Sequence, residues 1–157
     1  MATMRGSDTN LVHLLSGLIS IDFDAIEAYE AAIERLNSPE DRDQFRFFMH
    51  DHVRHTRELA SVVRQLGGSP PAGGDFKRML TKGKVLLAAL VDDRAVLLAM
   101  KSNESDTNLA YERAVRHPEL TTEIRRLLEE NLGDERRHKA WIEARLEAIG
   151  RSSQTHA

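Results

Sequence analysis

Apolar side chains recur every three or four residues along four long stretches of this chain, and no other feature constrains its fold as strongly. This is the period of an α-helix that buries one face against its neighbours. No stretch follows the two-residue alternation of a half-buried strand. The sequence therefore predicts an all-α protein, with its main helices at about residues 8–36, 38–66, 92–117 and 119–149.

Several helix boundaries are marked by residues with capping preferences. Ser38-Pro39 predicts a helix start, because a hydroxyl group caps free backbone N–H groups and proline is tolerated in the first turn. Gly67 predicts the end of that helix, and Gly150 predicts the end of the last one.

The lengths of the connections predict the topology. The first two helices are joined by a short connection, which makes them antiparallel neighbours, whereas the second and third are far apart in sequence. Residues 75–91 in that long stretch have the pattern of a further helical segment. Short, long, short connections predict an antiparallel four-helix bundle with one crossover. We expect one domain at residues 8–150, with flexible termini at 1–7 and 151–157.

Composition excludes several functional classes. The net charge is −3 and the arginine pairs lie among acids, so no nucleic-acid partner is expected. The absence of cysteine excludes disulfides, thiolate metal sites and cysteine nucleophiles. No apolar run approaches the roughly 20 residues of a membrane span, and the N-terminus lacks a signal-peptide pattern. We therefore expect a cytoplasmic protein without a membrane partner.

The two halves of the chain resemble each other. Ala-Tyr-Glu occurs around Tyr29 and again around Tyr111, and an acid stands seven residues before each tyrosine, at Asp22 and Glu104. In the second and fourth helices, His52-x-x-His55 corresponds to Glu135-x-x-His138. This repeat indicates two copies of a helical hairpin.

Six polar side chains fall in phase with the apolar face of the four helices, near the middle of each. They are Asp22, His52, His55, Glu104, Glu135 and His138. Burying an unpaired carboxylate costs several kcal/mol, so three of them need compensation in a domain stable by only about 5–15 kcal/mol. Because no Lys or Arg shares these positions, protonated histidines or metal ions must supply it.

Two interpretations of this set remain open. Three imidazoles and three carboxylates suit Fe, Mn or Zn, and residues three apart on a helix, such as Glu135 and His138, can bind the same ion or adjacent ions. The set can also be a buried network of imidazolium–carboxylate pairs that holds no metal.

On these residues the chain resembles the ferritin-like superfamily, in particular small bacterial proteins related to rubrerythrin and bacterioferritin. Residues 22–29 resemble the acid-to-tyrosine stretch of the family's first helix, Glu104 matches the acid of the third, and Glu135-Arg-Arg-His138 is an intact E-x-x-H motif. The resemblance implies a ferritin-like bundle that binds one or two divalent ions, with iron expected and Mn or Zn as alternatives. It also implies oxidase or peroxidase chemistry on O2 or peroxide, in iron handling or oxidative stress.

The chain departs from the family pattern at two ligands. His52 stands where the family has a bridging glutamate, and Asp22 is one methylene shorter than the usual Glu. Three carboxylates then face the four positive charges of two divalent ions, where the family supplies four. A mononuclear or asymmetric site, or zinc in place of iron, is the expectation that follows. With no cysteine, electrons for a peroxidase reaction must come from a partner protein.

A second class of function stays in view, namely a non-catalytic helical protein that uses the bundle for assembly or partner binding. For Tyr29 and Tyr111, packing in the core competes with hydrogen bonds to Asp22 or Glu104, which the family resemblance implies. We expect a homo-oligomer, and a dimer rather than a cage, because the tail after Gly150 is short and polar.

Overall fold

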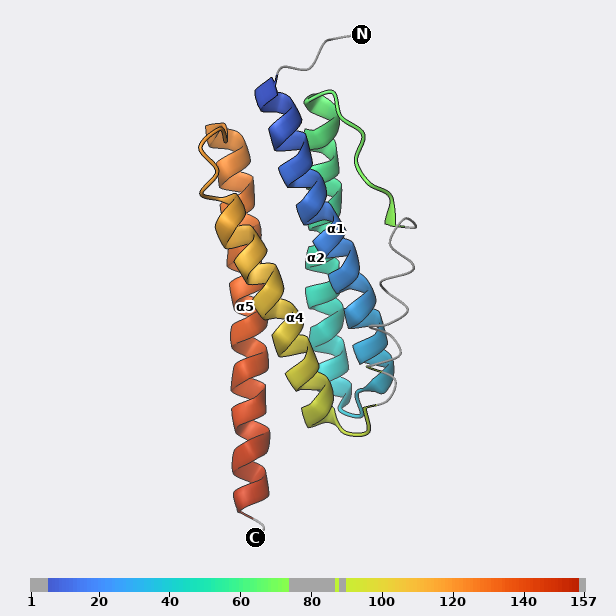
Figure 1. The fold of residues 1–157 in the computed structure, drawn as a ribbon. Helices are drawn as coiled ribbons and strands as arrows, with labels where there is room; N and C mark the ends of the chain where they lie inside the picture. Colours follow the sequence, from blue (N-terminus) through green and yellow to red (C-terminus); the bar gives the residue numbers. More distant parts are fainter. Residues whose placement is uncertain (1–5, 74–86, 88–89, 156–157) are drawn as a thin grey trace.

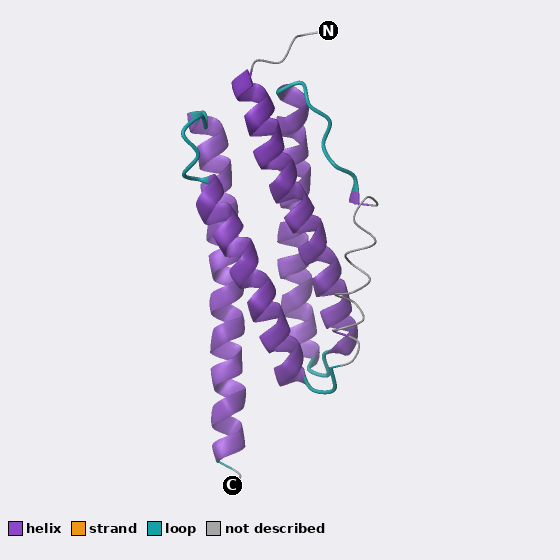
Figure 2. Ribbon diagram, in the orientation of Figure 1, coloured by secondary structure: helices purple, strands orange, loops and turns teal. Residues whose placement is uncertain are grey.

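The computed structural model describes residues 6–73, 87 and 90–155. Its helices are α1 (Gly6–Arg35), α2 (Pro39–Gln65), α4 (Asp93–Ala114) and α5 (Thr122–Gln154). The described residues contain no strand, which confirms the predicted all-α class (Figure 2). The further helical segment predicted at residues 75–91 lies almost entirely outside the described residues.

The predicted start and end of α2 are confirmed. The Ser38 side chain accepts a hydrogen bond from the backbone N–H of Asp41, and Pro39 occupies the first turn. Gly67 follows the helix with a positive φ of 85°, a conformation that glycine adopts without steric cost. The last helix starts later than predicted, at Thr122, because the Thr121 side chain accepts from the backbone N–H of Ile124.

The prediction that Gly150 ends the last helix is wrong, since α5 continues to Gln154. Gly150 keeps a helical conformation and its backbone hydrogen bonds stay in register. The hydroxyl groups of Ser152 and Ser153 donate to carbonyls four residues earlier, at 3.1 Å in both cases, and so follow the helical spacing. A single glycine costs a helix only about 1 kcal/mol, which does not by itself end it.

The four helices form an antiparallel bundle with the predicted connectivity (Figure 1). α1 runs antiparallel to α2 and α4 runs antiparallel to α5, and each pair packs as a hairpin. α2 and α4 point the same way, so the connection between them joins opposite ends of the bundle. The C-terminal end of α5 projects beyond the other helices.

The core consists of two apolar clusters separated along the bundle axis. One contains Leu11, Leu15 and Ile19 of α1, and the other contains Ala32 of the same helix and Leu36 directly after its end. Asp22 lies between these two groups in sequence. It is one of several buried polar residues that form a layer midway along the bundle. Among the described residues, no helix is long and apolar enough to cross a membrane.

Candidate metal centre

All six polar residues singled out from the sequence meet in the middle of the bundle, and each is fully buried, with 0% of its surface exposed. α1 contributes Asp22 and α4 contributes Glu104. α2 contributes two histidines, and α5 contributes Glu135 and His138. The burial of all six confirms the helical phase predicted from the apolar pattern.

One group of possible ligands joins α1, α2 and α5. Asp22, His52, His55 and Glu135 each offer one donor atom, and these atoms all lie within 4.8 Å of one another. His52 Nδ1 lies 2.8 Å from Asp22 Oδ1, and His55 Nδ1 lies 3.3 Å from the same oxygen. Glu135 Oε1 lies 3.2 Å from His55 Nδ1. Two imidazoles and two carboxylates thus surround one small volume.

A second group joins α2, α4 and α5. It consists of His52, Glu104, Glu135 and His138, again with donor atoms within 4.8 Å of one another. Glu104 Oε1 lies 3.5 Å from both His52 Nε2 and His138 Nδ1. Glu135 Oε2 lies 3.9 Å from His138 Nδ1. The two groups share His52 and Glu135, so they are adjacent.

The outer ring nitrogens of two histidines are held by carboxylates from the facing helix. His55 Nε2 on α2 lies 3.0 Å from Asp134 Oδ2 on α5, and His138 Nε2 on α5 lies 2.9 Å from Asp51 Oδ2 on α2. Each contact leaves Nδ1 of the ring facing the centre. A carboxylate at the outer nitrogen is the usual partner of a metal-binding histidine, because it fixes the ring and raises its basicity.

Sequence reasoning did not single out Asp51 and Asp134, although a signal was present. Each acid immediately precedes one of the two motifs, His52-x-x-His55 and Glu135-x-x-His138, so the internal repeat includes them. Arg54 and Arg137 both bond to Asp134, the latter at 2.8 Å from Oδ1. These acids therefore connect the buried histidines to arginines at the surface.

Both tyrosines donate hydrogen bonds to carboxylates of the centre. Tyr111 Oη on α4 lies 2.5 Å from Asp22 Oδ2 on α1, and Tyr29 Oη on α1 bonds to Glu104 Oε1 on α4. Of the two alternatives for these tyrosines, core packing alone or hydrogen bonds to Asp22 and Glu104, the structure shows the hydrogen bonds that the family resemblance implied. Burial, followed by the charge of the nearby carboxylate, raises the pKa of each tyrosine well above its usual value, so both remain protonated donors.

The carboxylates strongly favour protonation of the histidines. Burial alone lowers the pKa of His55, but its contacts with Asp22 and Glu135 outweigh burial and raise that pKa to about 10. The pKa of His52 and that of His138 are raised for the same reason. Imidazolium groups can therefore balance the buried carboxylates as long as no other cation is bound.

Hydrogen bonds nevertheless leave much of the centre unsatisfied. Among the described residues, the buried polar atoms without a hydrogen-bond partner include His52 Nε2, Glu104 Oε2, both carboxylate oxygens of Glu135, and His138 Nδ1. Buried polar groups are nearly always paired, and each exception needs an explanation such as an ion. These five atoms come from the four residues of the second group, and their nitrogen and oxygen chemistry fits divalent iron, manganese or zinc.

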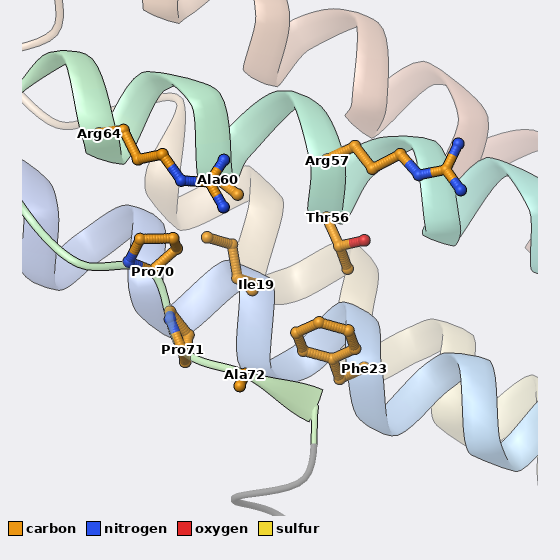
Figure 3. A pocket seen from close by; sticks show the side chains of 9 residues that line it. All are labelled: Ile19, Phe23, Thr56, Arg57, Ala60, Arg64, Pro70, Pro71 and Ala72. Atoms are coloured by element: carbon orange, nitrogen blue, oxygen red, sulfur yellow. The ribbon is translucent and has the colours of Figure 1, made fainter.

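A surface groove lies beside the centre but is not lined by any of the six residues (Figure 3). Phe23 and Thr56, which line it, directly follow Asp22 and His55 in the chain. The complete lining consists of Ile19, Phe23, Thr56, Arg57, Ala60, Arg64, Pro70, Pro71 and Ala72. The groove is therefore a separate feature, between α1, α2 and the segment after α2.

Comparison with known proteins supports the fold. The family described as "Domain of unknown function (DUF2383)" matches residues 10–117. A search of curated proteins found no match. Among solved structures, a dodecameric thioferritin from Bacteroides fragilis, described as a bacterioferritin-related protein, is similar with a TM-score of 0.81 and 15% identity. The similarity covers 94% of this chain and 90% of that one.

Proposed function

This chain belongs to the DUF2383 family and has a ferritin-like fold, and we propose that it binds two divalent metal ions in the middle of its bundle. The observation that carries the proposal is a set of five buried nitrogen and oxygen atoms there that make no hydrogen bond. Without a cation these atoms lose the hydrogen bonds of water and make no protein hydrogen bond in return. A metal ion satisfies them and balances the carboxylates.

The ligands would divide between two positions. Asp22 and His55 would bind one ion, Glu104 and His138 would bind the other, and Glu135 lies between them with one oxygen toward each histidine. Each position combines carboxylate oxygen with imidazole nitrogen. This mixture suits iron, and manganese and zinc are the alternatives.

Iron in such a centre would supply redox chemistry toward O2 or peroxide, as expected for a role in iron handling or oxidative stress. The chain's own residues hold the ligands in place for it. Tyr111 and Tyr29 hold one oxygen of Asp22 and of Glu104 by hydrogen bonds, and Asp51 and Asp134 fix the histidine rings. The two apolar clusters on either side exclude water from the layer between them.

A second candidate is a non-catalytic bundle whose centre carries only protons. The observation in its favour is the raised pKa of all three histidines, which lets imidazolium groups neutralise the carboxylates. In that case the protein would act in assembly or partner binding. The five unpartnered atoms argue against it, because a proton network that had replaced the metal would be expected to satisfy them.

We also propose that the chain forms a homo-oligomer. The sequence favoured a dimer, whereas the similar thioferritin is dodecameric, which favours a larger assembly. Sedimentation velocity of the purified protein distinguishes a dimer from a dodecamer by mass.

Metal analysis of protein purified without added metal tests the main proposal. We expect two divalent ions per chain, and we expect Glu135→Ala to lose them, whereas Glu130→Ala, which changes an exposed acid on the same helix, keeps them. A wild-type protein that is folded and stable but takes up no iron, manganese or zinc, even after reconstitution, would refute metal binding. Oxygen uptake on adding iron(II) then separates an oxidase from a structural site.

A further inference from the structure

His52 differs from the other two histidines of the centre because both of its ring nitrogens face possible ligand sets. We propose that His52 bridges the two metal ions as an imidazolate, binding one ion through Nδ1 and the other through Nε2. This inference rests on the proposed function and adds to it the identity of the bridging group.

The two nitrogens of His52 point to different groups. Nδ1 lies 2.8 Å from Asp22 Oδ1 and 3.4 Å from Glu135 Oε1, in the first group. Nε2 lies 3.5 Å from Glu104 Oε1, in the second group, and has no hydrogen-bond partner. The ring is thus oriented with one nitrogen toward each position.

The neighbouring imidazoles flank His52 almost evenly. Its ring centre lies 5.6 Å from that of His55, which belongs to the first group, and 5.2 Å from that of His138, which belongs to the second. The side chain therefore stands between the two proposed ions. If His52 bound only one of the two ions, its ring would be expected to lie closer to either His55 or His138.

The contrast with His55 and His138 supports the assignment. Each of those rings uses Nε2 for a contact with an outer carboxylate, Asp134 or Asp51, and has only Nδ1 left for a metal ion. Nε2 of His52 instead points to Glu104, which is itself a ligand candidate, so both of its nitrogens remain available to metal ions.

Charge balance gives an independent reason. Asp22, Glu104 and Glu135 supply three negative charges, while two divalent ions carry four positive ones. An imidazolate supplies the fourth negative charge. Starting from the imidazolium, each ring nitrogen loses its proton to water and uses the freed electron pair to bind one ion, with no change in oxidation state. A neutral imidazole in this position would leave a buried excess charge, which is costly.

Copper(II) is a suitable probe, because nitrogen and oxygen ligands bind it more strongly than other first-row divalent ions and its unpaired electron is visible by electron paramagnetic resonance. Titration of the metal-free protein should give an ordinary mononuclear signal with the first equivalent. The second equivalent should abolish that signal, because the two spins couple through the shared ring. Metal content is measured on the same samples.

Two variants assign the coupling to the ring. His52→Gln removes both ring nitrogens, and with them the proposed bridge, but keeps Glu135, so bound copper should stay uncoupled and keep its full signal. His50→Gln is the matched control, since His50 is exposed on the same helix, and it should behave as wild type. Circular dichroism checks that each variant is folded.

Three outcomes would overturn the bridge while leaving metal binding intact. They are two uncoupled copper signals in the wild type, coupling that persists in His52→Gln, and binding of a single ion. Failure to bind any metal would instead refute the proposed function itself. If His52→Gln does not fold, zinc-loaded wild-type crystals decide the question. The bridge requires two anomalous peaks, each about 2.0–2.1 Å from a different nitrogen of His52; a peak at only one nitrogen contradicts it.

Discussion

Asp51 on α2 and His138 on α5 are joined across the bundle, with 2.9 Å between Oδ2 and Nε2, and this contact orients the histidine. The same relationship joins Asp134 on α5 to His55 on α2, at 3.0 Å. Each helix thus supplies the carboxylate that fixes the histidine of the other. The two hairpins are coupled through these pairs as well as through the core.

Replacing Asp51 by Asn should weaken metal binding without removing it. The amide keeps the size of the side chain but loses the charge that orients His138 and raises its basicity. Loss of such a partner lowers metal affinity by roughly 10–100-fold. Competition with a chelator of known affinity measures the change. Asp43→Asn, on the exposed face of the same helix, is the control, and equal affinities in the two variants would contradict the role assigned to Asp51.

The metal-free protein should lose stability as the solution becomes alkaline. The pKa of His55 is raised from 6.5 to about 10 in the folded chain, so its protonation stabilises the fold fully below pH 6.5. That stabilisation is lost as the pH rises through about 10. We expect the denaturation midpoint of the metal-free wild type to decrease as the pH is raised from 6.5 to 10. The midpoint of His55→Gln should decrease less over this range. Identical pH profiles for the variant and the wild type would contradict protonation of His55 in the folded chain.

Metal affinity should rise with pH over the same range. The three histidines hold protons that compete with the ions, because nearby carboxylates raise the pKa of each one. Zinc binding followed by calorimetry in buffers of different ionisation enthalpy counts the protons released. Release of no protons near neutral pH would show that the histidines are already neutral in the metal-free chain.

Removing the hydroxyl of Tyr111 should destabilise the metal-free protein more than the metal-bound one. Tyr111→Phe leaves the buried Asp22 carboxylate without one of its donors, at a cost of about 1–3 kcal/mol in the free energy of unfolding. A bound ion compensates part of that loss. Tyr29→Phe should act in the same way through Glu104. Urea denaturation with and without metal measures both variants, and an unchanged midpoint in the metal-free form would count against these hydrogen bonds.

Much of the fold follows from helical phase and capping. The spacing of Leu11, Leu15 and Leu18 places Asp22 on the buried face, and its surface is in fact fully buried. Ser38 and Gly67 mark the ends of α2 because their effects are local. The end of α5 could not be predicted from Gly150, since a small local cost does not decide whether a helix continues.

The contents of the candidate centre were predictable, but its internal geometry was not. Periodicity shows that Asp22 and Tyr111 face inward, yet they lie on α1 and α4, and only the packing of the two hairpins brings them together. Asp134 and Asp51 could have been found from the repeat, because each directly precedes a motif. The direction of the two ring nitrogens of His52 depends on a side-chain torsion that no sequence pattern fixes.

The most direct test of the account is the number of metal ions that the intact chain binds. Native mass spectrometry during a zinc titration should show two ions per chain in the wild type and one in Glu104→Ala, which loses a ligand of the second group only. A wild-type chain that is folded but binds no zinc ion, even at excess zinc, would contradict the central claim.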